Sequence, residues 1–496
     1  MDGLNHLATA LASLASPLQV AYALGATLAG IVIGLLPGLS ATLGVALFTT
    51  LTIKMAPTDA ILVLICVYVG AIYGGSRTAI LLNIPGTAAN AAACLDGNML
   101  ARQGRAGRAM GIATTGSVAG SLFGVVCLAM FTPLLAETAL KFGAFEFFWL
   151  GMVGVMMSGS LTGANPIKGW LMGLLGIFVA SIGLDPIHAH ARFTFDQNPI
   201  SGGIGLIPAL VGAFGFAEIL TVMGEPKLKA MVNSVDSVLP KVADLLRYWR
   251  TILRSGLIGV FIGILPGVGE DMAAWSSYAA AKRASREREQ FGKGSVEGLI
   301  AAETGDNAAI PGALIPALAL GIPGSAPAAV LMAAMIIHGA QPGPMLMINQ
   351  PQFIYDVVGI TLVATLAMLV FGLILVRPIL WVLRVPRDII MPIVFVLCVL
   401  GSYSITQRLF DVWTMLVVGI VCFALRRRGF PVAPFVLGLV LGDIVDKSLR
   451  RGLVLSDGSL LPFFTRPISA VLALLVLVML VAQVPALRRL ADFRKP

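Results

Sequence analysis

The segment Gly30-Ile-Val-Ile-Gly34-Leu-Leu-Pro37-Gly38 decides the fold, because a second copy follows later as Gly259-Val-Phe-Ile-Gly263-Ile-Leu-Pro266-Gly267. The three glycines and the proline coincide, at an offset of 229 residues (266 − 37). Proline lacks a backbone N–H group and disrupts a helix, whereas glycine adopts non-helical angles at no steric cost. Each copy therefore predicts an apolar helix that is broken at its Pro-Gly.

A second pair of motifs follows in the same order. Leu82-Asn-Ile-Pro-Gly-Thr-Ala88 resembles Leu320-Gly-Ile-Pro-Gly-Ser-Ala326, at an offset of 238 residues (323 − 85). Chance could supply one Leu-Pro-Gly in a chain with 55 glycines, but two ordered pairs are harder to explain in that way. We predict two related halves. The predicted division is an N-terminal segment 1–16, a first membrane repeat 17–225, a polar linker 226–250, a second membrane repeat 251–470, and the end of the last helix with a basic tail 471–496.

Composition places the chain in a membrane. Of its 496 residues, 57% are hydrophobic and only 12% are charged, whereas soluble domains carry about 25% charged residues. Apolar windows of spanning length recur along the chain, and we expect roughly 10 to 12 membrane segments, some of them broken. The segments are rich in Gly, Ala and Leu and lack the alternation of a β-barrel. The predicted fold class is an all-α polytopic membrane protein.

The breaks also suggest a function. At membrane depth, backbone groups that a break sets free must find partners in the protein or in a watery cavity. Broken helices at corresponding positions of two halves indicate the binding site of a secondary transporter. We therefore expect inverted repeats whose re-entrant tips meet near the midplane. A parallel repeat would leave the same motifs, and a single Pro-Gly could be only a kink or an interfacial turn.

The net charge of +9 fits an excess of basic residues in cytoplasmic loops, and no nucleic-acid partner is predicted. Basic residues flank the second Leu-Pro-Gly on both sides, so we expect both flanks on the cytoplasmic face and a re-entrant hairpin between them. No cleavable signal peptide is expected in residues 1–16. The flanking residues are Arg247, Arg250 and Arg254 before the motif, and Lys282, Arg283, Arg286 and Arg288 after it.

The breaks supply candidate contacts for an anionic substrate. Helix N-termini favour carboxylates, and hydroxyl or amide side chains donate to an anion without the burial of a lysine. Serine and threonine also bond to their own helix, which is the plainer reading of each one alone. The candidate substrate-binding residues are Pro37, Gly38, Ser40, Thr42, Gly74, Gly75, Ser76, Asn83, Pro85, Gly86, Thr87, Asn90, Pro266, Gly267, Pro323, Gly324 and Ser325.

Arg77 is a further substrate-binding candidate, because it lies in an otherwise apolar stretch where charge is expensive and often functional. It could pair with a substrate carboxylate, extend to the membrane interface, or pair with an acidic side chain. The stripe Gly116, Gly120 and Gly124 predicts a smooth helix face for close packing.

Acidic residues gather in the second half. Glu270, Asp271, Glu303, Asp306 and Asn307 are candidates for a coupling-ion site, because oxygen ligands suit a hard cation and a carboxylate can carry a proton. The coupling cation would be Na⁺ or H⁺, and no other cofactor is expected. The competing reading is that Glu270 and Asp271 cap a helix start at an aqueous face.

No metal site or catalytic residue is predicted. His188 and His190 lie near Asp185, but a fourth ligand is missing. The cysteines, Cys66, Cys94, Cys127, Cys398 and Cys422, show neither disulfide nor metal spacing. H-E-x-x-H and G-x-S-x-G motifs are absent. A membrane-embedded enzyme and a passive anion channel stay as alternatives to a transporter.

A set of short motifs is distributed along the chain. They are Tyr73-Gly-Gly-Ser76, Ala79–Thr87, Leu95-Asp-Gly97, Gln103–Arg108, Gly312–Pro316, Gly321–Ser325, His338–Pro344, Leu449-Arg-Arg451, Ser456-Asp-Gly458 and Arg466-Pro467. Together they resemble the large membrane subunit of tripartite tricarboxylate transporters, over nearly the whole chain. The resemblance implies a permease of the bacterial cytoplasmic membrane that imports small organic carboxylates, tricarboxylates or related acids, by ion-driven symport. It also implies a small membrane subunit and a periplasmic solute-binding protein as partners.

By motif, the resemblance assigns functional importance to Pro37, Gly38, Gly74, Gly75, Ser76, Asn83, Pro85, Gly86, Thr87, Asp96, Glu303, Asn307, Pro323, Gly324, Ser325 and His338. The chain departs from the family in Ala302-Glu-Thr-Gly-Asp-Asn307, where Pro-Glu-Ala-Ala-Asn-Asn is common. Glu270 and Asp271 also replace residues that are commonly small. Because these changes alter the charge at a candidate site, the family resemblance does not assign citrate as the substrate.

Overall fold

A computed structural model of the chain describes residues 2–36, 38–161, 165–185, 190–224, 242–375, 378 and 387–481. Nearly all of them are helical, and the one sheet among them is a two-stranded hairpin. In this described part, seven helices are long and apolar enough to cross a membrane, and five shorter apolar helices accompany them. The predicted all-α membrane fold is therefore confirmed. The seven are Pro17–Leu35, Pro57–Leu82, Ala106–Ala139, Leu206–Met223, Pro351–Ile374, Asp388–Thr406 and Leu409–Arg427.

The chain forms two compact units. Unit 1 comprises Met1–Ala136 and Ile207–Phe423, and unit 2 comprises Glu137–Leu206 and Ala424–Pro496. Each predicted repeat contributes residues to both units, so the boundaries of the compact units do not coincide with the predicted repeat boundaries. The division into two repeats stays a prediction. Most of the predicted linker and of the basic tail, residues 225–241 and 482–496, lie outside the described residues.

Unit 1 contains two closely packed pairs of helices with the same glycine contacts. Helix α2 (Pro17–Leu35) packs on α4 (Pro57–Leu82), and α14 (Trp249–Ile264) packs on α16 (Val296–Leu320). A Cβ atom at Gly34 would lie 2.0 Å from the Ala71 carbonyl oxygen. A Cβ at Gly263 would lie 2.6 Å from the corresponding oxygen of Ala309. In both pairs, only glycine allows the backbones to approach this closely.

The second break has the same geometry in both predicted repeats. Helices α4 and α16 end at left-handed residues, Asn83 with φ 58° and Gly321 with φ 72°. Beyond them, the Gly86 amide donates to the Gly75 carbonyl oxygen at 3.3 Å, and the Gly324 amide donates to that of Ala313 at 3.3 Å. The freed backbone groups of each break are thus bonded to the helix that precedes it.

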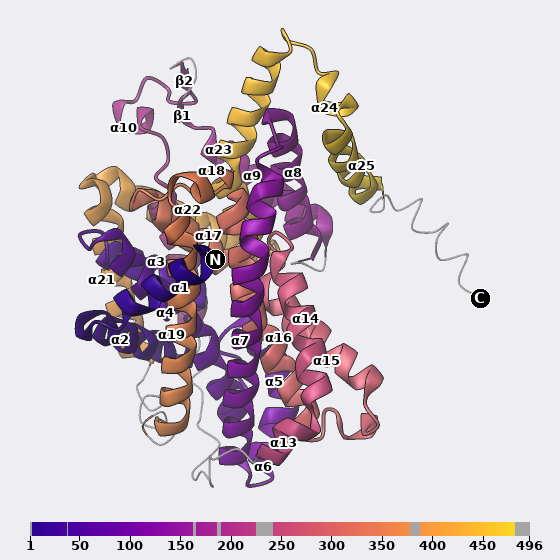
Figure 1. Cartoon of the computed structure of the whole chain (residues 1–496). Helices are drawn as coiled ribbons and strands as arrows, with labels where there is room; N and C mark the ends of the chain where they lie inside the picture. Colours follow the sequence, from indigo (N-terminus) through magenta and orange to yellow (C-terminus); the bar gives the residue numbers. More distant parts are fainter. Residues whose placement is uncertain are drawn as a thin grey trace. The chain divides into compact units, whose positions relative to one another are not determined.

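The segments that follow the breaks of one predicted repeat pack on segments of the other repeat. Helix α3 (Ala41–Leu51), after the first break, packs on α17 (Ala326–Ile337). Helix α15 (Gly269–Ala284) packs on the 3-10 helix η1 (Ala88–Asn90) and on α5 (Ala91–Ala93). Figure 1 shows α14, α15 and α16 side by side. Each predicted repeat therefore places its broken segments against those of the other.

The basic flanks of the second Leu-Pro-Gly lie together. Arg247 forms an ion pair with Glu287, and the Tyr248 hydroxyl donates to the same carboxylate. Thr251 and Ser285 both donate to Glu297, each at 2.6 Å. This proximity agrees with a hairpin formed by α14 and α15, and the membrane face on which the flanks lie stays a prediction.

The remaining elements of unit 1 surround these pairs. They are α1 (Asp2–Leu14), η2 (Cys94–Asn98), α6 (Met99–Arg102), α7 (Ala106–Ala139), α11 (Leu206–Leu210), η3 (Val211–Phe216), α12 (Ala217–Met223), α13 (Val242–Arg247), η4 (Arg288–Gln290), α18 (Pro344–Asn349), α19 (Pro351–Ile374), α21 (Arg387–Thr406) and α22 (Leu409–Arg427). Helices α7, α11 and α22 extend across the boundaries between the units.

The glycine stripe of α7 packs on α16, since a Cβ at Gly120 would lie 2.2 Å from the Thr304 carbonyl oxygen. The predicted packing role of the stripe is confirmed.

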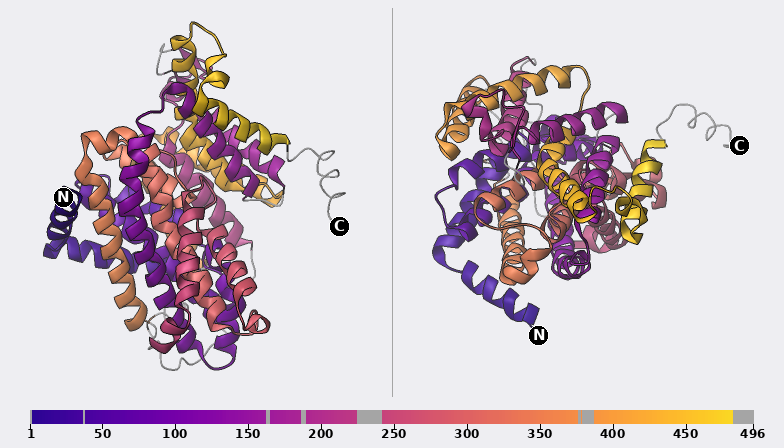
Figure 2. Two further views of the ribbon diagram at one scale, coloured as in Figure 1. Left: turned by 45° about the vertical axis from the view of Figure 1, so that its right-hand side comes forward. Right: turned by 90° about the horizontal axis from the view of Figure 1, so that it is seen from above.

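Unit 2 is a smaller group of helices. Its elements are α8 (Ala144–Leu161), α9 (Pro166–Ala180), β1 (Gly183–Leu184), β2 (Ala191–Arg192), α10 (Asn198–Ser201), α23 (Val432–Leu455), α24 (Pro462–Thr465) and α25 (Pro467–Val481). Helices α8, α9 and α23 pack on one another, and Figure 2 shows α24 and α25, in yellow, beside α8. A Cβ at Gly438 would lie 2.0 Å from the Gly173 carbonyl oxygen, so glycines again set the helix distance.

Gly34→Ala is expected to lower the free energy of unfolding by about 1–3 kcal/mol, because the added methyl group overpacks α2 against the α4 backbone. Gly25→Ala in the same helix is the matched control, since no atom lies within 4 Å of the position of its Cβ. The measurement is the apparent melting temperature of the purified protein in detergent. Equal melting temperatures for the two variants would contradict this close packing.

Candidate functional site

A fully buried polar cluster lies in unit 1 where α4, η1, α7 and α16 meet. It contains Ser76 from α4, Asn90 from η1, Ser117 from α7, and Glu303 and Asp306 from α16, each at most 1% exposed. Helix α16 is almost entirely buried, so both of its acidic side chains lie in the protein interior. Burial of ionisable groups costs free energy in a membrane protein, and such groups are commonly retained because function requires them.

Two hydroxyl groups hold the Glu303 carboxylate. Ser76 Oγ and Ser117 Oγ each donate to Glu303 Oε2 at 2.8 Å. The Asn307 side-chain amide donates to the Glu303 carbonyl oxygen at 3.1 Å. Ser76 and Ser117 come from different helices, so the carboxylate joins α4 and α7 to α16.

Asn90 joins the second break of the first predicted repeat to Asp306. Its Nδ2 lies 3.0 Å from Asp306 Oδ2 and 3.0 Å from Ser76 Oγ, and Thr87 Oγ1 donates to its Oδ1 at 2.6 Å. A Cβ at Gly75 would lie 2.0 Å from that Oδ1, so only glycine at position 75 leaves room for the amide.

Two oxygens of this cluster are buried without a hydrogen-bond partner in the described part of the chain. They are Asp306 Oδ1 and Asn307 Oδ1. A buried oxygen without a partner costs free energy that a proton or a cation would recover. No group of three or more His, Cys, Asp or Glu among the described residues is arranged to hold a metal ion, and His188 lies outside those residues. A cation here would therefore combine carboxylate with amide, hydroxyl or carbonyl oxygens.

A second buried cluster connects the two breaks of the second predicted repeat. Tyr68 of α4 donates to the Glu270 carboxylate at the start of α15, and its hydroxyl lies 2.8 Å from Ser325 Oγ at the start of α17. Glu270 is 3% exposed, whereas the neighbouring Asp271 is exposed. Glu270 therefore does not face water as the capping interpretation supposed, and Asp271 stays a candidate for the coupling-ion site.

The two clusters correspond to each other. Tyr68 and Asp306 are separated by 238 residues (306 − 68), which is the offset of the second sequence pair. Each side chain lies on the long helix of one predicted repeat and bonds a residue at or beyond the second break of the other, Ser325 for Tyr68 and Asn90 for Asp306. The same position thus carries a phenol in one repeat and a carboxylate in the other.

Arg77 is fully buried and is held by α7. Its Nη1 donates to the Met110 carbonyl oxygen at 2.7 Å, its Nη2 donates to Thr114 Oγ1 at 2.9 Å, and its guanidinium lies 4.1 Å from the centre of the Tyr73 ring. The absence of exposure argues against an extended side chain at the membrane interface. It forms no ion pair with any described residue, and a role in substrate binding stays a prediction.

The candidate residues at the first break of each predicted repeat form fewer polar contacts. Ser40 Oγ accepts from the Leu43 amide at 3.2 Å and caps α3, as Ser325 caps α17 through the Ala328 amide at 3.3 Å. Gly38 and Gly267 have left-handed φ values of 95° and 72°. Of the other candidates, Thr42, Gly74, Gly86, Thr87, Gly267, Pro323 and Gly324 are buried, Asn83 and Pro85 are exposed, Pro266 is partly exposed, and Pro37 lies outside the described residues.

Sequence reasoning missed Tyr68 and Ser117. Tyr68 could have been found by applying the 238-residue offset to Asp306, whereas Ser117 lies inside the glycine stripe and gave no signal of its own. Asp96, assigned by motif, is a buried anchor. Its Oδ1 accepts from the amides of Gly292, Gly294 and Ser295 at 2.8–2.9 Å, and its Oδ2 accepts from the Tyr278 hydroxyl at 2.8 Å.

Arg77→Lys should lower the apparent melting temperature, because an ammonium group cannot bond Met110 and Thr114 while stacking on Tyr73. Arg105→Lys, at an exposed arginine, is the control and should leave stability unchanged. Thermal unfolding and the substrate concentration for half-maximal uptake are measured together. Unchanged stability with a raised half-maximal concentration would instead place Arg77 at the substrate.

Comparison with known proteins now identifies the family. Residues 20–437 match the tripartite tricarboxylate transporter TctA family. An uncharacterized 52.8 kDa protein of the TAR-I ttuC' 3' region of Agrobacterium vitis is 34% identical over 99% of this chain and 98% of its own length. A protein of the TAR-II ttuC' 3' region of the same organism is 35% identical over 47% of this chain and 97% of its own length. No solved structure gives a significant match. The chain belongs to the tripartite tricarboxylate transporter TctA family.

Proposed function

We propose that the chain is the permease subunit of a binding-protein-dependent secondary transporter of the bacterial cytoplasmic membrane. It imports small organic carboxylates by symport with Na⁺ or H⁺, together with a small membrane subunit and a periplasmic solute-binding protein. The observation that carries the proposal is the buried pair Glu303 and Asp306 beside the broken segment that bears Asn90.

The proposal includes two related repeats in inverted orientation. The repetition of contacts supports the relation between the repeats, and their inverted orientation is part of the proposal. The repeated contacts are α2 on α4 and α14 on α16, a left-handed end to α4 and α16, and an amide bond from each second break to the preceding helix. A transporter built in this way holds its ligands where the broken helices of the two repeats meet. In unit 1 that place contains the two polar clusters.

The charges of the clusters explain why transport would be coupled. Glu270, Glu303 and Asp306 are buried carboxylates, and the nearby cation Arg77 is held by α7. An anionic substrate that approaches such a site alone is repelled. A cation or proton that binds the carboxylates removes the repulsion, so each ligand raises the affinity for the other by the same factor. We propose that the cation binds before the carboxylate.

The candidate ions use different atoms. A sodium ion would take the unpartnered oxygen of Asp306 or that of Asn307, with further oxygen ligands from hydroxyl or carbonyl groups. A proton would reside on one of the buried carboxylates. The substrate carboxylate would meet the residues around the breaks, from Gly38 to Thr42 and from Gly324 to Ser325.

The first experiment is uptake of a panel of labelled carboxylates by cells that express the chain with its two partner subunits, with and without sodium. Accumulation above the external concentration that collapses with an ionophore supports coupled transport. Equilibration without accumulation would indicate a passive anion channel. No uptake of any acid would contradict the proposed substrate class.

Asp306→Asn should raise the cation concentration required for half-maximal uptake by roughly tenfold, equal to about 1.4 kcal/mol of binding free energy. The preference among carboxylates should stay the same. Glu297→Gln is the matched control, because Glu297 is also a buried acidic residue of α16, and the hydroxyl groups of Thr251 and Ser285 donate to its carboxylate. A changed substrate preference with unchanged cation dependence would move Asp306 from the cation site to the anion site.

A further inference from the structure

The second polar cluster of unit 1 is a chain of three buried oxygen-bearing side chains. The Tyr68 hydroxyl donates to the Glu270 carboxylate and lies 2.8 Å from Ser325 Oγ. Ser325 Oγ also accepts from the Ala328 amide at 3.3 Å. Tyr68 is fully buried, and Ser325 and Glu270 are 2% and 3% exposed. The chain therefore connects a buried carboxylate to the second break of the second predicted repeat.

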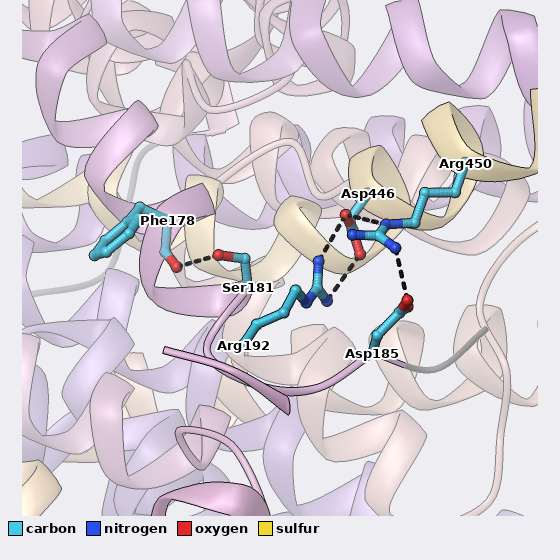
Figure 3. Close-up of polar contacts among 6 residues, drawn as sticks. All are labelled: Phe178, Ser181, Asp185, Arg192, Asp446 and Arg450. Atoms are coloured by element: carbon cyan, nitrogen blue, oxygen red, sulfur yellow. Dashed lines mark hydrogen bonds and ion pairs between the residues drawn. The ribbon is translucent and has the colours of Figure 1, made fainter. Parts of the chain in front are cut away.

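The carboxylate at one end of this chain has no counter-charge. Glu270 forms no ion pair with any residue that the structure describes. In unit 2, by contrast, the buried Asp185 is compensated, because Arg450 donates to it at 2.6 Å (Figure 3). Burial without a cation favours the neutral form of a carboxyl group. Glu270 is therefore suited to carry a proton.

The charged groups nearest to Glu270 are also acidic. Asp306 of α16 interacts electrostatically with Glu270 and with Glu303, and Asp271 follows Glu270 in α15. Negative neighbours favour a neutral carboxyl group further. The cation Arg77 is held by α7, and η1, α5 and α17 contain no charged residue. At the opposite end of the hairpin of α14 and α15 lie Arg250, Arg254, Lys282, Arg283, Glu297 and the charged residues of η4.

The hydrogens of this chain have two arrangements, because either Tyr68 or Ser325 can be the donor in their contact. When Glu270 is ionised, Tyr68 donates to Glu270 and Ser325 donates to Tyr68. When Glu270 gains a proton, its new O–H group donates to the Tyr68 oxygen, and the Tyr68 hydrogen turns to Ser325 Oγ. That oxygen then accepts from Tyr68 and from the Ala328 amide, which uses both of its lone pairs. The hydrogen of Ser325 is released.

The first cluster cannot reverse in this way. Asn90 Nδ2 lies 3.0 Å from Asp306 Oδ2, and an amide nitrogen donates but does not accept. Thr87 Oγ1 donates to the Asn90 oxygen at 2.6 Å. The direction of the contact between Asn90 and Asp306 is therefore fixed, and only the cluster of Glu270, Tyr68 and Ser325 has two arrangements.

We propose that Glu270, Tyr68 and Ser325 form a proton-operated switch for the substrate carboxylate. When Glu270 is ionised, Tyr68 engages the hydrogen of Ser325, and the anion finds no donor there. When Glu270 is protonated, the Ser325 hydroxyl is free to donate to a carboxylate, and one negative charge near the anion is removed. The inference rests on the proposed function, in which Ser325 contacts the substrate. It assigns the proton to Glu270 and leaves the cation to Asp306 or Asn307, whose unpartnered oxygens accept one.

The test measures how the affinity for the substrate depends on pH. The full chain and its small subunit are reconstituted in proteoliposomes with saturating sodium and the same pH on both sides. Uptake is started with the binding protein and a labelled carboxylate that is fully ionised at every pH used. For the unmodified protein, the concentration for half-maximal uptake should rise with pH, by up to about tenfold per pH unit, because one proton binds with each carboxylate.

Two variants separate the switch from a structural role. Tyr68→Phe leaves the Ser325 hydroxyl permanently free, and Glu270→Gln keeps the position neutral, so each should transport with an affinity that no longer depends on pH. Tyr278→Phe is the matched control and should keep the pH dependence. Tyr278 is also a buried tyrosine between the predicted repeats, and it donates to the buried Asp96 carboxylate at 2.8 Å.

The outcomes distinguish this inference from the proposed function. A pH dependence that persists in both Tyr68→Phe and Glu270→Gln, or that is missing from the unmodified protein, would overturn the switch and leave the transporter standing. A raised sodium requirement in Glu270→Gln would also overturn it, because Glu270 would then be a cation ligand. Melting temperatures are measured first, and if Tyr68→Phe does not fold, Glu270→Gln decides the question. An unmodified protein that takes up no carboxylate would contradict the proposed function itself.

Discussion

Hydrocarbon offers no hydrogen-bond partner to a broken helix, and the structure of unit 1 follows from that constraint. Each second break is bonded to the helix before it, through the Gly86 amide in one case and the Gly324 amide in the other. Both bonds require a close approach. A Cβ at Gly86 would lie 2.1 Å from the Gly34 carbonyl oxygen, and one at Gly324 would lie 2.0 Å from that of Gly263. The glycines of the first motif pair therefore make room for the glycines of the second pair. This dependence explains why the two motifs occur together in each predicted repeat, and why the breaks can be buried at all.

Glycine packing fixes the backbone, and side chains on that frame then distinguish the two predicted repeats. Under the 238-residue offset, Glu303 corresponds to Ile65 and Asp306 corresponds to Tyr68. One repeat thus contributes carboxylates where the other contributes an apolar side chain and a phenol. Conversely, Ser76 and Asn90, which surround the carboxylates, come from the first repeat. A nearly symmetric frame with unlike side chains can provide two different sites, one for a cation and one for an anion, at equivalent places.

Much of the fold was predictable, because its causes are local or compositional. Hydropathy indicated the membrane, and Pro-Gly motifs indicated the breaks, which the described residues confirm at Gly86, Gly267 and Gly324. The site was predictable only in part. Glu270 and Asp271 are neighbours in sequence, but adjacent residues of a helix point in different directions, and only Glu270 is buried. The hydroxyls that hold the acids come from far away in sequence: Ser76 and Ser117 lie 227 and 186 residues from Glu303. A pattern within one helix carries no information about such partners.

Arg77 shows why burial alone does not identify a ligand contact. Its charge is placed where an anion could be recognised, and its sequence context suggested that role. Its two terminal nitrogens donate to Met110 and Thr114 and its guanidinium stacks on the Tyr73 ring, although its Nε has no partner among the described residues. Asp306 and Asn307 differ in the kind of group that lacks a partner, because each keeps a buried oxygen, an acceptor, without a partner in the described chain. The free energy that such oxygens recover on binding is available for coupling, whereas that of a satisfied group is not. For a cation the unpartnered oxygens of Asp306 and Asn307 are therefore the relevant groups, since an N–H donor such as Arg77 Nε cannot coordinate one.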